Sequence, residues 1–184
     1  MTNFTVPTKE EVSAENQATF DGLEQKLGFV PNVYAALAYS DNALNAYLSL
    51  SESQAKGSLS AKEREAVNLI VSQVNGCRYC QSAHTAIGKM NGFTDEEVLQ
   101  LRKGESEDAK LDALVKLARE IAINRGNPSE AAVNRFFEAG YDKGNLIDVV
   151  LNVSDITVTN YVNNITQVPI DFPVAPDLAQ EVTA

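Results

Sequence analysis

Two cysteines and the only histidine of the chain lie within one eight-residue segment, 77–84. On a helix, which turns about 100° per residue, Cys77, Cys80 and His84 would share one arc of about 60°. Two cysteines one turn apart can close to a disulfide with modest adjustment and reopen without large rearrangement. The spacing therefore predicts a redox-active cysteine pair with an imidazole beside it.

The imidazole matters because a free thiol, with a pKa of about 8.5, is only a few per cent thiolate at neutral pH, and the thiolate is the reactive form. His84 lies one turn from Cys80 and two turns from Cys77, so it is better placed to deprotonate Cys80. The positive end of the helix dipole favours a thiolate at Cys77 instead. We expect Cys80 to be the attacking cysteine and Cys77 to be its exposed resolving partner.

Glu65 is expected to support the histidine. Asn75-Gly76 breaks the helical pattern, so the two flanking helices should fold back as an antiparallel hairpin. Glu65 and His84 then lie about 15 Å and about 12 Å from the turn, which brings them side by side. A carboxylate there would orient the imidazole and raise its basicity. The alternative is a solvated helix residue without a catalytic role.

The elements that position these residues are expected to be helices. Capping residues open apolar runs with helical spacing and glycines close them, whereas strand signals are few. Thr8, Ser60 and Thr94 each begin a sequence typical of a capping box. We predict helices over residues 8–27, 40–57, 60–74, 77–91, 94–103, 109–124, 129–139 and 144–165, with a connector at 28–32.

The segment 144–165 is ambiguous, because its β-branched residues favour a strand while its length without a turn signal favours a buried helix. From about residue 168 the chain should be an irregular tail. We expect one all-α domain over residues 1–184, with its core motif at 60–92. Segments 69–79 and 151–161 share a faint pattern, which indicates a degenerate duplication of a helical hairpin or a coincidence between apolar helices.

Charge and composition exclude several classes of partner. The formal net charge is −10, and no dense Lys/Arg cluster offsets the acids, which argues against nucleic acid. The start of the sequence has neither the basic nor the apolar region of a secretory signal, and no apolar run approaches a membrane span. We therefore expect a cytoplasmic protein, in which cysteines are more often catalytic or metal-bound than structurally bridged.

The pattern Glu65, eleven intervening residues, then Cys77-x-x-Cys80-x-x-x-His84 resembles the active-site signature of the AhpD-like alkylhydroperoxidase and carboxymuconolactone decarboxylase superfamily. The match fixes four residue types at set spacings beside the expected helix break. Segments 28–32 and 160–169 resemble the flanks of its peroxidase-related members. The resemblance implies an AhpD-like helical bundle, homo-oligomers, and reduction of peroxides by the cysteine pair without metal, flavin or other cofactor.

The same resemblance implies residue roles. Cys80 would attack the peroxide, Cys77 would resolve the sulfenic acid as a disulfide, and Glu65 and His84 would relay protons. Tyr79 departs from the pattern, because the characterised peroxidases that the chain resembles carry a histidine there. A phenol with a pKa near 10 can donate a hydrogen bond but is a poor base, so Tyr79 is a candidate proton relay or a packing residue.

The sequence therefore predicts a cysteine-based peroxidase, or thiol-disulfide oxidoreductase, that reduces organic or hydrogen peroxides and is restored by an external dithiol or a thioredoxin-like reductant. Four alternatives stay open. The cysteines could belong to a zinc site with His84, which would need a fourth ligand such as Glu65 or water. They could be inert core residues. The chain could also be a non-redox decarboxylase-like enzyme, or a non-catalytic ligand-binding or oligomerisation module.

Overall fold

The computed structural model describes residues 4–178, and within this range the chain folds into helices joined by loops, without a strand. The all-α prediction is confirmed. The elements are the short 3₁₀ helix η1 (Lys9–Glu11) and the helices α1 (Ala14–Leu27), α2 (Asn32–Leu37), α3 (Ala43–Ala55), α4 (Ala61–Val74), α5 (Arg78–Met90), α6 (Asp95–Lys103), α7 (Ala109–Ile123), α8 (Glu130–Glu138) and α9 (Lys143–Thr166).

Most helix ends follow the predicted capping chemistry. Ser60 and Thr94 form complete capping boxes at the starts of α4 and α6. The box at Thr8 begins only the 3₁₀ turn η1, and α1 starts later, where the side chain of Ser13 accepts a hydrogen bond from a backbone N–H. The predicted helix over 8–27 is therefore two elements.

A short helix, α2, begins at the end of the expected connector 28–32. The sequence did not predict this helix. Pro31, with a φ of −55° and a non-helical ψ of 134°, is the N-cap residue of α2. Four of the six residues of α2 are buried, so packing stabilises the helix although it is too short to show a periodic pattern.

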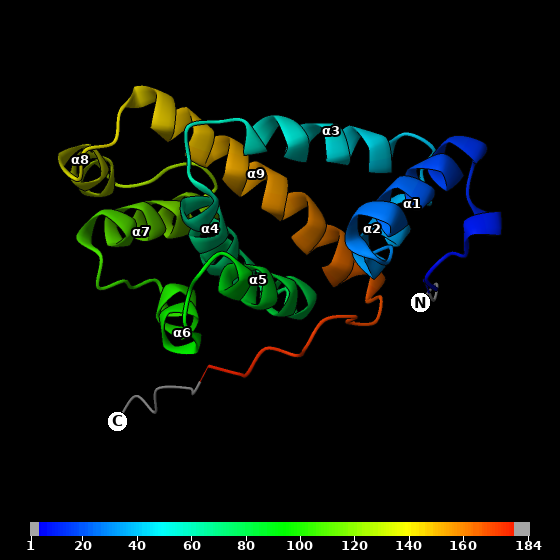
Figure 1. Cartoon of the computed structure of the whole chain (residues 1–184). Coiled ribbons are helices and arrows are strands. Elements are labelled where there is room, and N and C mark those ends of the chain that lie inside the picture. The colour runs from blue at the N-terminus through cyan, green and yellow to red at the C-terminus, as the bar shows by residue number, and fades with distance from the viewer. Residues whose placement is uncertain (1–3, 179–184) are drawn as a thin grey trace.

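The ambiguous segment near the C-terminus is a helix. α9 runs unbroken over 24 residues and crosses the molecule diagonally beside α3 and α4 (Figure 1). It contacts α2, α3, α4, α5 and α7, and this burial outweighs the strand propensity of its β-branched residues. Because residues 151–161 lie within this one helix, the faint sequence repeat does not form a second hairpin.

Two apolar clusters hold the helices together. The larger is centred on α4, and the smaller joins α1, α2 and α3. Five apolar residues of α4 are no more than 1% exposed, which fixes the helix that carries Glu65. These five are Ala66, Val67, Leu69, Ile70 and Val71.

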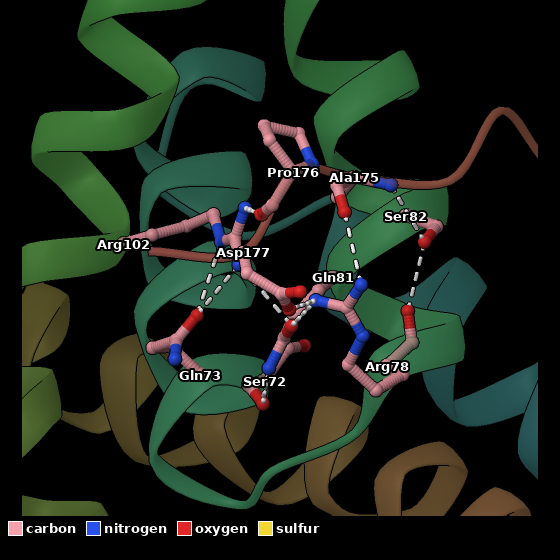
Figure 2. Close-up of polar contacts among 9 residues, drawn as sticks. All are labelled: Ser72, Gln73, Arg78, Gln81, Ser82, Arg102, Ala175, Pro176 and Asp177. Atoms are coloured by element: carbon pink, nitrogen blue, oxygen red, sulfur yellow. Dashed lines mark hydrogen bonds and ion pairs between the residues drawn. The ribbon is translucent and has the colours of Figure 1, made fainter. Parts of the chain in front are cut away.

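After α9 the chain runs back in an extended path past α5 and α6 (Figure 1). The buried guanidinium of Arg102 donates hydrogen bonds to Oε1 of Gln73 (2.9 and 3.0 Å), to Oε1 of Gln81 (3.2 Å) and to the carbonyl of Pro176 (2.8 Å). Figure 2 shows this group between α4, α5 and the C-terminal segment. The segment is thereby fixed to the face of α5 that carries Gln81.

None of the helices in the described range has both the length and the apolar character that crossing a membrane requires.

Candidate active site

The cysteine pair lies at the turn between α4 and α5. Gly76, with a φ of +65°, makes the left-handed turn that ends α4. Cys77 is then the N-cap of α5, and its Sγ accepts a hydrogen bond from the backbone N–H of Cys80 (3.2 Å). The two sulfurs lie 2.6 Å apart and are not bonded as a disulfide.

The prediction that Cys77 is exposed is wrong, because Cys77 is 0% and Cys80 2% exposed. The N-cap side chain folds back over the first turn of α5, and α9 covers it, with Oδ1 of Asn163 3.8 Å from its sulfur. Cys80 differs in one respect, since it lines a cavity and Cys77 does not. Small molecules in that cavity meet Cys80 first.

The two thiols influence each other's ionisation. The hydrogen bond between the two thiols lowers the pKa of Cys77, with further help from backbone N–H groups and from the charge of His84, although burial opposes it. The same hydrogen bond, together with burial, raises the pKa of Cys80. Of the two thiols, Cys77 is therefore the stronger acid, as the helix N-terminus would predict.

The expected contact between Glu65 and His84 is confirmed. Oε2 of Glu65 lies 2.7 Å from Nδ1 of His84, across the α4–α5 hairpin. Asn68 donates to Oε1 of Glu65 (3.1 Å), and Asn152 donates to Asn68 (2.7 Å). A chain of hydrogen bonds from α9 through α4 thus fixes the carboxylate, which in turn orients the imidazole.

Burial alone would lower the pKa of His84, but the charge and hydrogen bond of Glu65 outweigh burial and raise the pKa above its usual value. With Nδ1 directed at Glu65, Nε2 is the ring nitrogen left for reaction chemistry. Within the described chain, the hydrogen bonds of the Cys80 thiol go to Cys77 and Thr159 rather than to His84. A proton passing between Cys80 and His84 would need an intervening atom.

Cys80, Glu65 and His84 line one cavity of ≈ 490 Å³, a size typical of small-molecule sites. Its walls come from α2, α3, α4, α5 and α9 and from the segments after α1 and α9. Apolar and aromatic groups dominate its lining, including Leu27, Phe29, Val33, Ile87, Met90 and Phe172. The arrangement can hold an organic molecule with its reactive end at the sulfur.

Asp155 is a residue of this cavity that the sequence analysis missed. It is 6% exposed, and burial raises its pKa to about 6, with His84 opposing the rise and Glu65 adding to it. A signal was present, since Asp155 is the one charged residue of the segment 149–159. A charge inside a buried helix is costly and therefore indicates a function.

Tyr79 also lines the cavity, but its hydroxyl is directed away from the sulfurs. It accepts a hydrogen bond from the backbone N–H of Val33 (3.3 Å), and its ring packs edge-on against Phe172. Burial and a hydrogen bond with Asp171 raise its pKa. This environment fits the packing interpretation better than the relay.

The zinc alternative gains no support from the described residues, among which no three His, Cys, Asp or Glu side chains are gathered as metal ligands. The four residues of the sequence motif are instead arranged in two pairs, the two thiols and the Glu65–His84 pair.

Comparisons with known proteins agree with the fold and the motif. The carboxymuconolactone decarboxylase family profile matches residues 41–123, which include Glu65, Cys77, Cys80 and His84. A search of the curated proteins found no match.

Several crystal structures share the fold. An uncharacterized peroxidase-related protein from Silicibacter sp. TM1040 is 25% identical, with a TM-score of 0.78 over 88% of this chain and 87% of that chain. The alkylhydroperoxidase AhpD core protein from Ralstonia eutropha JMP134 is 22% identical, with a TM-score of 0.77 over 87% of each chain.

A cysteine-to-alanine variant of the debrominase Bmp8, in complex with 2,3,4-tribromopyrrole, is 17% identical, with a TM-score of 0.76 over 93% of this chain and 92% of that chain. The family profile over residues 41–123 and the fold shared with these structures support the resemblance of the chain to the AhpD-like, carboxymuconolactone decarboxylase superfamily.

Proposed function

We propose that the protein is a cysteine-based peroxidase that reduces organic hydroperoxides through a Cys77–Cys80 disulfide cycle. The observation that carries the proposal is the contact of two sulfurs 2.6 Å apart, one of which lines a cavity beside the Glu65–His84 pair. The two structural neighbours described as peroxidase-related or as an AhpD core support the same class of reaction.

In the first step the proton of Cys80 moves to Cys77, and the Cys80 thiolate attacks the terminal oxygen of the peroxide. The O–O bond breaks, an alcohol leaves once protonated, and Cys80 becomes a sulfenic acid. Access assigns the attack to Cys80, because the Cys77 sulfur, although it is the better thiolate, has no exposed surface and does not line the cavity.

In the second step the Cys77 thiol gives up its proton and attacks the sulfenic sulfur. The sulfenic hydroxyl leaves as water, and the disulfide forms. His84, held by Glu65, acts through an intervening water as the base that accepts the Cys77 proton and the acid that protonates the leaving hydroxyl. An external dithiol or thioredoxin-like protein then reduces the disulfide to restore both thiols.

Self-association is part of the proposal. The outer face of α9 carries apolar side chains at helical spacing that lack cover within the described chain, including Ile147, Tyr161 and Ile165, which are 67%, 56% and 72% exposed. A second copy of the chain is the occupant we expect. Light scattering should give a mass above 19.9 kDa.

The roles of the two cysteines can be tested with serine variants and a sulfenic-acid trap. With one equivalent of cumene hydroperoxide, Cys77→Ser should accumulate a sulfenic acid on Cys80, because the resolving thiol is absent. Cys80→Ser should stay reduced. The wild type should show little trapped sulfenic acid and lose both thiols together.

Reversal of the two variants would leave the reaction class intact and exchange the roles of the cysteines. Thiols that remain unreacted in the wild type, while peroxide is not consumed, would refute the peroxidase proposal.

A further inference from the structure

Asp155 is a buried carboxyl group of the cavity that the proposed cycle has not used. It lies on α9 and is 6% exposed, and its Oδ1 receives no hydrogen bond from any described residue. A buried polar atom without a partner costs stability. Its place on the cavity wall therefore indicates that it acts on molecules that enter the cavity.

Asp155 is close to the reacting sulfur. Thr159, one turn further along α9, has its Oγ1 4.0 Å from Sγ of Cys80. Residues four apart on a helix face the same side, with Cβ atoms about 6 Å apart. A peroxide that contacts Cys80 with one oxygen can therefore direct its other oxygen toward the carboxyl group of Asp155.

The attack on an alkyl hydroperoxide needs an acid at that second oxygen. When the O–O bond breaks, the departing oxygen would otherwise leave as a strongly basic alkoxide. The Tyr79 hydroxyl accepts from the backbone N–H of Val33, and its own proton is shared with Asp171. His84 is assigned to the sulfur chemistry. The proton for the departing oxygen must therefore come from another group.

We propose that Asp155 is the general acid that protonates the leaving oxygen of an alkyl hydroperoxide attacked by Cys80. The inference rests on the proposed peroxidase function. The Cys80 thiolate forms the S–O bond, the O–O electron pair goes to the departing oxygen, and the Asp155 carboxyl gives that oxygen its proton. The products are a sulfenic acid, an alcohol and the Asp155 carboxylate, which regains a proton from solvent through the cavity.

The surroundings of Asp155 suit this role. Burial raises its pKa to about 6, the charge of His84 opposes the rise, and Glu65 adds to it. A substantial fraction of the Asp155 carboxyl groups is then protonated near pH 6, whereas an exposed aspartate would be almost fully ionised. The ionisable side chains on the other elements of the cavity wall are Tyr34 on α2, Tyr47 on α3, Arg64 and Glu65 on α4, and Tyr79, Cys80 and His84 on α5.

Two oxidants separate this role from a structural one. The leaving group of tert-butyl hydroperoxide is an alkoxide that needs a proton, whereas peracetic acid releases a carboxylate that does not. The chain has no tryptophan, so the rate of Cys80 oxidation is best followed by quenched flow, alkylation and mass spectrometry. The wild type is compared with Asp155→Asn, with Asp155→Glu, and with Asp148→Asn, which removes a half-buried carboxylate of the same helix that accepts from Ser58 and does not line the cavity.

Asp155→Asn should slow oxidation by tert-butyl hydroperoxide by about 100-fold or more and change oxidation by peracetic acid less than about 3-fold. Asp155→Glu should recover part of the loss, and Asp148→Asn should resemble the wild type. If Asp155→Asn slows oxidation by both oxidants equally, or slows neither, the role of Asp155 is overturned and the peroxidase function is not. Wild-type thiols that resist both oxidants overturn the peroxidase function and this inference together.

The wild type provides a second test that does not depend on a variant folding. The measured quantity is the rate with tert-butyl hydroperoxide divided by the rate with peracetic acid. Effects of pH on the sulfur cancel in this ratio, because both reactions share them. We expect this ratio to fall as the pH rises from about 5 to about 7, because Asp155 loses its proton with a pKa of about 6. A ratio that stays constant over this range overturns the proposal.

Discussion

The carboxylate of Glu65 lies 2.7 Å from Nδ1 of His84, which joins the two helices of the hairpin at the cysteine pair. The imidazole is the only one in the chain, so its ionisation can be followed without interference. Removing the charge of Glu65 should therefore have a measurable effect on the pH dependence of the reaction.

Glu65→Gln should shift the pH profile of peroxide turnover to lower pH. Glu65 is what raises the pKa of His84 against the effect of burial, so without its charge that pKa falls. The basic form of His84 then persists to lower pH, and the rising limb of the profile moves with it, while the maximum rate drops by about 10- to 100-fold. Steady-state rates measured across the acidic and neutral range report both effects.

The control is Glu96→Gln, which removes an exposed carboxylate from α6. It should leave profile and rate unchanged. A Glu65→Gln profile that keeps its midpoint would mean that Glu65 does not set the ionisation of His84.

Asp155→Asn should stabilise the fold at neutral pH. The folded-state pKa of Asp155, about 6, exceeds the usual value of about 3.9, so wild-type stability falls as the pH rises through this interval. The variant has no such loss. Its free energy of unfolding, relative to that of the wild type, should therefore rise by about 2 to 3 kcal/mol between about pH 4 and about pH 7. Urea denaturation across this range measures the difference in the free energy of unfolding. A difference that is independent of pH would show that Asp155 has an ordinary pKa in the folded protein.

Arg102→Ala should destabilise the protein by about 2 to 4 kcal/mol. Arg102 is 1% exposed, and its loss leaves Gln73 and the Pro176 carbonyl without their donor and Gln81 with Arg78 alone. Lys103→Ala, next along the chain but exposed, should change stability by less than about 0.5 kcal/mol. Hydrogen exchange should also rise at the Ala175 amide, which donates to Ser82, in the Arg102 variant, and unchanged protection there would contradict the role given to Arg102.

Tyr79→Phe should retain peroxide turnover. The hydroxyl accepts a hydrogen bond from Val33 N–H and the ring packs with the C-terminal segment, so loss of the hydroxyl should cost about 1 kcal/mol of stability. Turnover and urea denaturation of the same preparation test this. A turnover rate that drops by about 100-fold, the effect of losing a proton-transfer group, at unchanged stability would restore Tyr79 as a proton relay.

The sequence predicted the fold class, the principal helices and the Glu65–His84 contact because these depend on local signals. Capping boxes at Ser60 and Thr94, the break at Asn75-Gly76 and helical counting along a hairpin need no knowledge of distant segments. The same signals predicted one helix from Thr8, whereas only a 3₁₀ turn follows it and α1 begins at Ala14. A capping box fixes a first turn and not the turns that follow.

What the sequence could not supply depends on packing between distant segments. The burial of Cys77 follows from α9, more than sixty residues later, crossing the hairpin. The place of Asp155 beside Glu65 and His84 follows from the same crossing. The short helix α2 forms because tertiary burial stabilises it, and the sequence carries no periodic pattern for that.

A single-turnover thiol titration tests the central claim most directly. Fully reduced wild-type protein receives one equivalent of cumene hydroperoxide. Free thiols are then titrated, and the mass of the peptide containing residues 77–80 is measured by mass spectrometry. We expect both thiols to be lost, an intramolecular Cys77–Cys80 disulfide to form as the alcohol appears, and dithiothreitol to restore both thiols. Consumption of peroxide with both thiols still free, or oxidation of one cysteine without a disulfide, would contradict it.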